Sequence, residues 1–171
     1  IIIFSCILVS FLIVITFIDI EFLKIPYKLS VPCIITGFVW TVSIIYLGPE
    51  QNDWGLLINH LLASLTGYFS FYLFSQLILV LIKKPGLGLG DAKLAALSGS
   101  WLGFSGIELV TVISVLFAGL IATILLCTGI VKRGQYIPFA PFMSISIFLV
   151  WLLGNDFWIN NLGTILWWRY L

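Results

Sequence analysis

Long apolar runs occupy most of this chain, and only short polar breaks separate them. Hydrophobic residues make up 61% of the sequence and charged residues only 9%, whereas a soluble globular domain carries about 25% charge. A chain with so little polar surface cannot cover itself in water, so an integral membrane protein is predicted. Because a spanning helix needs about 20 apolar residues, the runs predict an all-α, polytopic membrane helical bundle.

The polar breaks divide the chain into about six transmembrane helices, followed by an interfacial segment at the C-terminal end. The expected helical segments are Ile1–Ile18, Ser30–Leu47, Trp54–Ile82, Ala92–Gly103, Ile107–Val131 and Ile137–Leu153. The tail Asn155–Leu171 is rich in Trp and Asn and is expected to lie at the membrane surface. No internal repeat or low-complexity linker interrupts the order, so residues 1–171 are predicted to form a single transmembrane domain.

Alternating the segments across the membrane sorts the charges into two sets. One side carries Lys24, Lys28, Lys83, Lys84, Lys93, Lys132 and Arg133, and the other carries Glu50, Asp53, Glu108 and Asp156. The positive-inside rule makes the first side cytoplasmic. Four tryptophans, Trp54, Trp101, Trp151 and Trp158, fall toward the other side and are expected to form an aromatic belt there. No basic patch of the kind that binds nucleic acid is present.

Two carboxylates are expected to meet at the cytoplasmic side. Asp91 follows the glycine-rich stretch 86–90 and is predicted to lie at the N-terminus of a helix, while Asp19 closes the first span. A helix from Asp91 to Gly103 is about 20 Å long, which is shorter than the hydrocarbon core. We therefore expect the glycine loop to dip into the membrane and Asp91 to face a hydrated pocket inside the bundle.

Paired carboxylates in a cavity can share one proton, so that one activates water and the other acts as an acid. Such chemistry needs no metal or cofactor, and with one histidine, His60, and no C-x-x-C pair we expect no metal site. Other interpretations stay open for each residue alone: Asp91 as a helix cap, Asp19 and Glu21 as interfacial charges. A phosphate cradle at 86–90 is disfavoured, because no GK[ST] follows it and no strand precedes it.

Three blocks of sequence, in order along the chain, resemble the type IV prepilin peptidases, which are GxGD-type intramembrane aspartyl proteases. The first block is DIE at 19–21 with IP at 25–26, Leu29 and Pro32. The second is GLGDAKL at 88–94 with WLG at 101–103, and the third is IPFAPF at 137–142, where Ala140 stands in place of the family's glycine. Tyr27 also stands where the family often has an aspartate.

The resemblance implies an aspartyl endopeptidase that removes the short basic leader of type IV prepilins or pseudopilins. It implies a substrate helix in the bilayer of the bacterial inner membrane, cut at the cytoplasmic face by Asp19 and Asp91. Residues expected to contact substrate are Glu21, Gly88, Gly90 and Lys93, and those expected to shape the site are Pro26, Pro138 and Pro141. Many family members also methylate the new N-terminus with S-adenosylmethionine and carry a C-x-x-C domain that these residues lack, so the expectation is confined to proteolysis.

Two rival interpretations remain at this stage. A presenilin or signal-peptide-peptidase relative would share the GLGD motif, but such proteins carry a Tyr-Asp pair and a Pro-Ala-Leu motif that do not occur here. A small proton-coupled transporter or a membrane scaffold could use Asp19 and Asp91 as a proton relay. A transporter would be expected to show repeat symmetry or paired broken segments, and the sequence shows neither.

Overall fold

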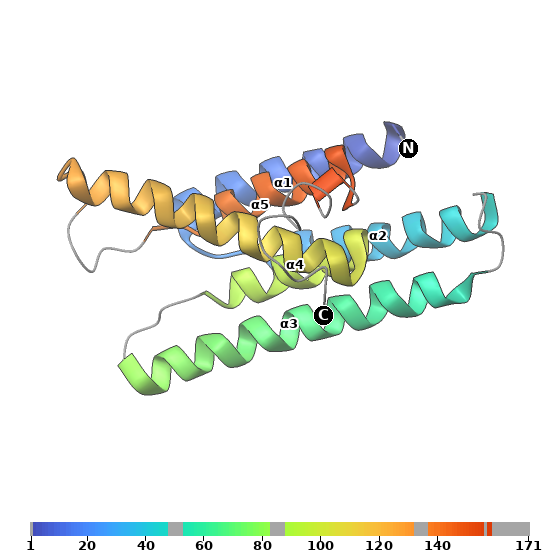
Figure 1. The fold of residues 1–171 in the computed structure, drawn as a ribbon, viewed down its shortest axis with the longest axis horizontal. Coiled ribbons are helices and arrows are strands. Elements are labelled where there is room, and N and C mark those ends of the chain that lie inside the picture. The colour runs from blue at the N-terminus through green and yellow to red at the C-terminus, as the bar shows by residue number, and fades with distance from the viewer. Residues whose placement is uncertain (1, 48–52, 83–87, 132–136, 156, 159–171) are drawn as a thin grey trace.

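The computed structural model describes residues 2–47, 53–82, 88–131, 137–155 and 157–158. These residues form five helices and, within the described ranges, no strand. The helices are α1 (Ile2–Phe22), α2 (Tyr27–Leu47), α3 (Trp54–Ile82), α4 (Leu89–Cys127) and α5 (Ala140–Leu153). They lie alongside one another in a bundle (Figure 1).

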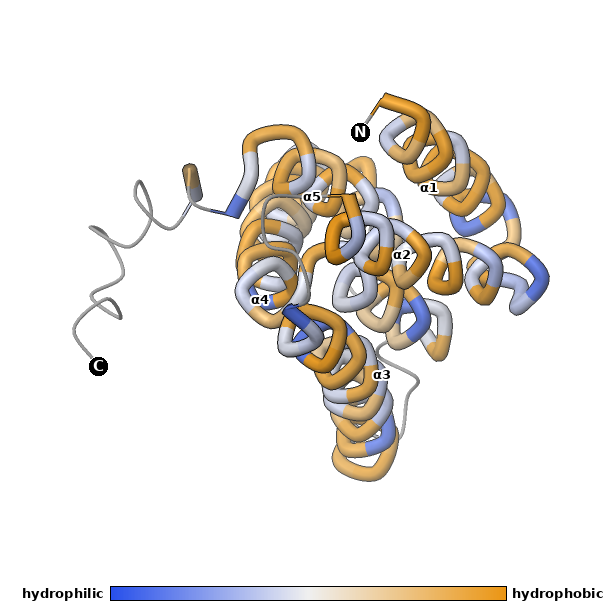
Figure 2. Tube along the Cα trace, turned by 90° about the vertical axis from the view of Figure 1, so that its right-hand side faces the viewer, coloured by the Kyte–Doolittle hydropathy of each residue, from blue (hydrophilic) through white to orange (hydrophobic). Residues whose placement is uncertain are grey.

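Four of the helices, α1 to α4, are long and apolar enough to cross a membrane, and α5 is a shorter apolar helix. Hydrophobic residues cover every helix along its length, with few hydrophilic positions between them (Figure 2). The prediction of an all-helical polytopic membrane bundle is therefore confirmed. Compared with the expected segments, α1 continues one turn further, α2 begins three residues earlier and α5 begins three residues later.

Helix α4 joins two of the six expected segments, and the chain bends between them at Gly103. This glycine has φ 69° and ψ −167°, a conformation outside the helical region that residues with a Cβ rarely adopt. The Phe104 backbone amide then donates a 3.0 Å hydrogen bond to Asn59 Oδ1 on α3. The expected boundary at Gly103 thus corresponds to a real break in the backbone.

The two arms of α4 run in opposite directions, and their register against α3 shows the reversal. On the first arm, Gly99 lies against Ala63 while Ala95 lies against Gly67, so this arm runs antiparallel to α3. The second arm runs parallel to α3, because Thr111 and Ser70 line one hollow and Val115 and Phe74, further along both helices, line the next. When the two arms of α4 are counted separately, the described residues contain six helical segments, the approximate number expected from the sequence. Both ends of α4 lie at the same end of the bundle (Figure 1).

The end of the bundle at which α1 ends and α2, α4 and α5 begin also carries the described lysines of the expected cytoplasmic set. Lys24 and Lys28 flank the α1–α2 connection, and Lys93 lies in the first turns of α4. Asp53 precedes α3, and Glu108 follows the bend in α4, at the other end. The remaining charges of the two sets, at 50, 83, 84, 132, 133 and 156, lie outside the described residues.

An aromatic cluster fills the core beside the bend of α4. Trp101 is only 1% exposed, lies edge-to-face with Trp151 at 5.2 Å between ring centroids, and donates from Nε1 to the Cys33 carbonyl at 2.9 Å. Trp40 and Phe4 extend the cluster on α2 and α1. The expected aromatic belt is therefore wrong for Trp101, because a ring placed among four helices gains more from burial than from the interface.

Candidate active site

Asp19 lies on the last turns of α1 and is 6% exposed. Its carboxylate accepts a hydrogen bond from the backbone amide of Ala140. That amide is free because Ala140 is the first residue of α5, where a helix leaves its N–H groups without internal acceptors. The next residue, Pro141, has no N–H to offer. The start of α5 therefore presents one backbone donor, and Asp19 takes it.

Asp91 lies in the first turn of α4 and is also 6% exposed. Its Oδ2 accepts a 3.1 Å hydrogen bond from the backbone amide of Gly88, and its own amide donates to the Gly88 carbonyl at 3.1 Å. The carboxylate thus caps the helix that carries it, as one of the open interpretations proposed, and the helix N-terminus favours its negative charge. The hydrated pocket expected beside Asp91 stays a prediction, since residues 83–87 lie outside the described part of the chain.

The fold brings the two aspartates, which are distant in sequence, close enough for their carboxylates to interact electrostatically. This proximity does not come from close packing of the two helix backbones, because in the described residues the backbones of α1 and α4 stay apart and the Phe4 and Trp101 rings meet at the other end of the bundle, 6.5 Å between centroids. Helix α5 packs against both α1 and α4, and α2 does the same. The pair is therefore held by the elements around it, α2 and α5.

Gly90 and Lys93, one turn apart on α4, both contact Ile25 in the connection between α1 and α2. A Cβ atom at Gly90 would lie 2.9 Å from Cγ1 of Ile25, so the glycine is needed for this close approach. At Gly88 a Cβ would meet nothing nearer than 3.7 Å, so its importance lies in the amide that Asp91 binds. Lys93 is buried and donates from Nζ to the Ile25 carbonyl at 2.5 Å.

The remaining candidate residues lie around the pair rather than in it. Glu21 is exposed on α1, and because the helix continues to Phe22 it points away from the face that carries Asp19. Pro26 ends the α1–α2 connection, and its carbonyl accepts from the amides of Leu29 and Ser30 at the start of α2. Pro138 precedes α5. Their contribution to binding or catalysis stays a prediction.

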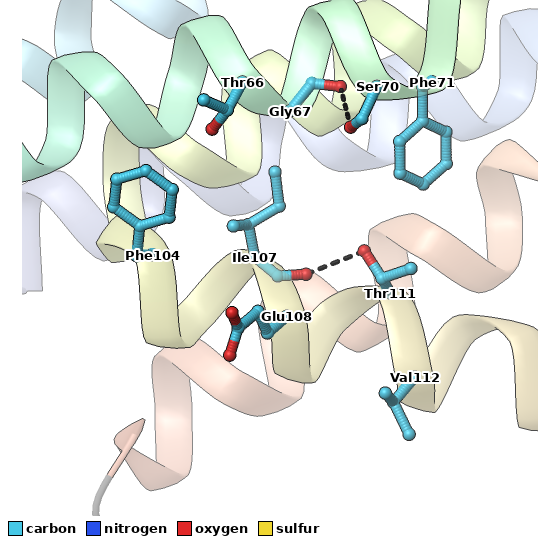
Figure 3. A pocket seen from close by; sticks show the side chains of 9 residues that line it. All are labelled: Thr66, Gly67, Ser70, Phe71, Phe104, Ile107, Glu108, Thr111 and Val112. Atoms are coloured by element: carbon cyan, nitrogen blue, oxygen red, sulfur yellow. Dashed lines mark hydrogen bonds between the residues drawn. The ribbon is translucent and has the colours of Figure 1, made fainter. Parts of the chain in front are cut away.

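Two adjoining hollows lie between α3 and the second arm of α4. The first has a volume of about 650 Å³, and it includes Thr66, Gly67, Ser70, Phe104, Ile107, Glu108 and Thr111 in its lining (Figure 3). The second, of about 610 Å³, shares Ser70, Phe71 and Thr111 with it and reaches Phe139 beside the start of α5. Neither aspartate lines these hollows, so the candidate catalytic pair lies outside both of them.

Sequence reasoning missed three groups that surround the aspartates: the Ala140 amide, the Ile25 carbonyl and the Tyr27 ring. Two of them are backbone groups, which every residue carries, so residue identity gives no signal for them. Ala140 and Tyr27 appeared in the sequence only as departures from a family pattern. Pro141 was the available signal, since proline in the first turn marks the start of a helix and thus a cluster of free amides.

Comparison with known proteins matches residues 6–127 to the model of the "Type IV leader peptidase family". Among curated proteins, the chain is similar to the "Prepilin leader peptidase/N-methyltransferase" of Neisseria gonorrhoeae, with 30% identity over 89% of the chain and 49% of that protein. The protein of the same name from Xanthomonas campestris is 31% identical over 89% of the chain and 50% of its own length. The chain thus spans about half the length of these relatives. No solved structure matches it significantly.

Proposed function

The chain belongs to the type IV leader peptidase family, and from this membership we propose that it cleaves the leader peptide from type IV prepilins or pseudopilins. The observation that carries the proposal is the buried pair Asp19 and Asp91, which the tertiary structure places within electrostatic reach of each other. Such a pair can hydrolyse a peptide bond without a metal, because one carboxylate accepts a proton from water while the other donates one to the scissile carbonyl.

The proposed mechanism assigns one shared proton to the two carboxylates. The ionised carboxylate takes a proton from water as the water oxygen attacks the scissile carbonyl carbon, and the protonated carboxyl donates its proton to the carbonyl oxygen. In the second step one hydroxyl of the tetrahedral intermediate returns its proton to the carboxylate that had acted as the acid, the C–N bond breaks, and the leaving nitrogen takes the proton that came from water, which restores the shared proton. The amides of Gly88 and Ala140 orient the two carboxylates by hydrogen bonds throughout.

The proposed orientation places the aspartates at the cytoplasmic face of the bacterial inner membrane. It is supported by Lys24, Lys28 and Lys93, which lie at the same end of the bundle as the pair, while Asp53 and Glu108 lie at the other end. A substrate helix already in the bilayer would then present the junction with its leader at the depth of Asp91. The relatives' names include an N-methyltransferase, which would use S-adenosylmethionine, but our proposal covers the peptidase step alone.

The test of this proposal is cleavage of a synthetic prepilin by the purified protein in detergent, with the products identified by mass spectrometry. We expect a single cut at the junction between the basic leader and the apolar helix, and we expect it to persist in EDTA. An absence of cleavage, with the protein shown to be folded by circular dichroism, would contradict the proposal. Proton flux in liposomes that depends on Asp19 and Asp91 would then favour a proton relay.

Replacing Glu21 with glutamine is expected to raise KM for a substrate with a basic leader several-fold and to leave kcat unchanged. Glu21 is exposed beside the site, so its charge can attract the leader without taking part in the chemistry. The interaction is screened by salt, and the difference between the variant and the wild type should therefore shrink between low and high ionic strength. A loss of kcat, or a KM effect independent of salt, would show that Glu21 acts in another way.

A further inference from the structure

Lys93 is a cation buried in the bundle without a described carboxylate partner. Its side chain is 8% exposed, and its Nζ lies 3.5 Å from the centroid of the Tyr27 ring while donating to the Ile25 carbonyl. Burying a charge is costly unless its donors are satisfied, and a carbonyl together with an aromatic face is a specific way to satisfy them. Neither solubility nor membrane orientation explains why this lysine is buried against a carbonyl and an aromatic ring.

The contact closes a short path between the two aspartates. Asp19 accepts a 2.9 Å hydrogen bond at its backbone carbonyl from the amide of Leu23, so the first residues of the α1–α2 connection are tied to it. Two residues later, Ile25 binds Lys93, and Lys93 is two residues from Asp91. Gly90 packs against the same isoleucine. Gly90 and Lys93, in one turn of α4, thus both contact the segment that follows Asp19.

This path matters because the backbones of the two helices that carry the aspartates do not pack against each other. In the described residues the Phe4 and Trp101 rings of α1 and α4 meet at the other end of the bundle, so near the aspartates the spacing depends on groups that bridge the two helices. One bridge is α5, through the Ala140 amide that binds Asp19. A second is α2, which packs against both helices, and a third is the hydrogen bond from Lys93 to the Ile25 carbonyl, formed by a side chain two residues from Asp91.

We propose that Lys93 is a positioning residue, which sets the separation of Asp19 and Asp91 by holding the Ile25 carbonyl and the Tyr27 ring. The expected effect of Lys93 on kcat rests on the proposed function, whereas its expected effect on the distance between α1 and α4 does not. It replaces the expectation that Lys93 contacts substrate with a different role, since its ammonium group is already engaged by the protein.

The kinetic test compares Lys93→Met with Lys28→Met, a loss of an exposed lysine beside the same connection. A misplacement of about 1 Å in a catalytic pair costs on the order of 10²-fold in rate, so we expect that loss in kcat for Lys93→Met, with KM within about twofold of wild type. Lys28→Met should retain the wild-type kcat. A raised KM with unchanged kcat would assign Lys93 to substrate binding and overturn the proposal.

Tyr27 supplies a second, conservative comparison. Tyr27→Phe keeps the aromatic face under the ammonium group, whereas Tyr27→Leu removes it, so we expect kcat near wild type for the first and a loss on the order of tenfold for the second. Equal effects of the two substitutions would show that the ring does not hold Lys93.

The structural test needs no substrate and therefore separates this inference from the proposed function. Nitroxide labels on Phe22→Cys and Leu89→Cys, both exposed, report the distance between the end of α1 and the start of α4. Exposed Cys6 and Cys127 are replaced by serine, and Cys33 is buried and stays. We expect Lys93→Met, but not Lys28→Met, to broaden or shift this pulsed electron paramagnetic resonance distance distribution.

A second label pair, on exposed Leu47 and Leu152, reports on the opposite end of the bundle and should be unchanged in Lys93→Met. An unchanged distribution between positions 22 and 89 overturns the proposal. Equal broadening at both ends overturns it as well, because Lys93 would then support the whole fold rather than the spacing of the aspartates.

Discussion

Replacing either Asp19 or Asp91 with asparagine is expected to lower the rate of leader cleavage by about 10³-fold or more. Asparagine has nearly the same shape and still offers an oxygen to the amides of Gly88 and Ala140, but it can neither take a proton from water nor donate one as an acid. The fold should therefore survive while the chemistry is lost. The measurement is single-turnover cleavage of a synthetic prepilin in detergent, with circular dichroism as the test of folding.

The double variant should be about as inactive as either single variant, because residues that act as a unit give strongly non-additive losses. Asp53→Asn is the matched control: Asp53 is exposed at the other end of the bundle, and asparagine can keep the hydrogen bond that Asp53 Oδ1 accepts from the Gly55 amide at 2.9 Å. Near-full activity in either Asp19→Asn or Asp91→Asn would refute the pairing, and Glu21 would become the next candidate.

Replacing Gly99 with alanine is expected to destabilise the bundle by about 3 kcal/mol and to reduce activity through the displacement of Asp91. A Cβ atom at this position would lie 2.5 Å from the Ala63 carbonyl carbon and the Ser64 amide nitrogen. Both are backbone atoms of α3, which cannot rotate away as a side chain would, so the first arm of α4 must move. For a chain of this length the corresponding fall in Tm is about 6–12 °C.

Gly119→Ala is the control for Gly99→Ala, because it makes the same substitution on the second arm of α4 with no atom within 4 Å of the new Cβ. Alanine favours a helix over glycine by about 1 kcal/mol, so this variant should be as stable as wild type or slightly more so. Thermal unfolding in one detergent, followed by circular dichroism, compares the two. Equal Tm values for them would mean that α3 and α4 do not pack as closely as the structure places them.

Much of the architecture could be predicted from particular residues. The limits of α3 were predicted as Trp54–Ile82 because the polar segment 48–53 and Lys83 bound one long apolar run. Other boundaries shifted where local hydrogen bonding decided them: Pro26 offers its carbonyl to two amides and α2 begins earlier than expected, whereas Phe139 offers its carbonyl to two amides and α5 begins later than expected. The break at Gly103 and the reversal of direction there were both foreseen, because alternating the segments 92–103 and 107–131 places Lys93 and Glu108 on opposite sides, but the hydrogen bond from the Phe104 amide to Asn59 on α3 was not.

The amino-acid sequence by itself determined that this chain forms a membrane-embedded helical bundle, since 61% hydrophobic residues and 9% charge permit no other compact state. It also singled out Asp19 and Asp91, because ionisable groups in apolar segments are rare and costly; that they catalyse cleavage stays a prediction. Only the tertiary structure decided how the pair is held. Asp19 binds the Ala140 amide and Lys93 binds the Ile25 carbonyl, and because backbone groups are common to all residues, such contacts arise only when segments distant in sequence are packed together.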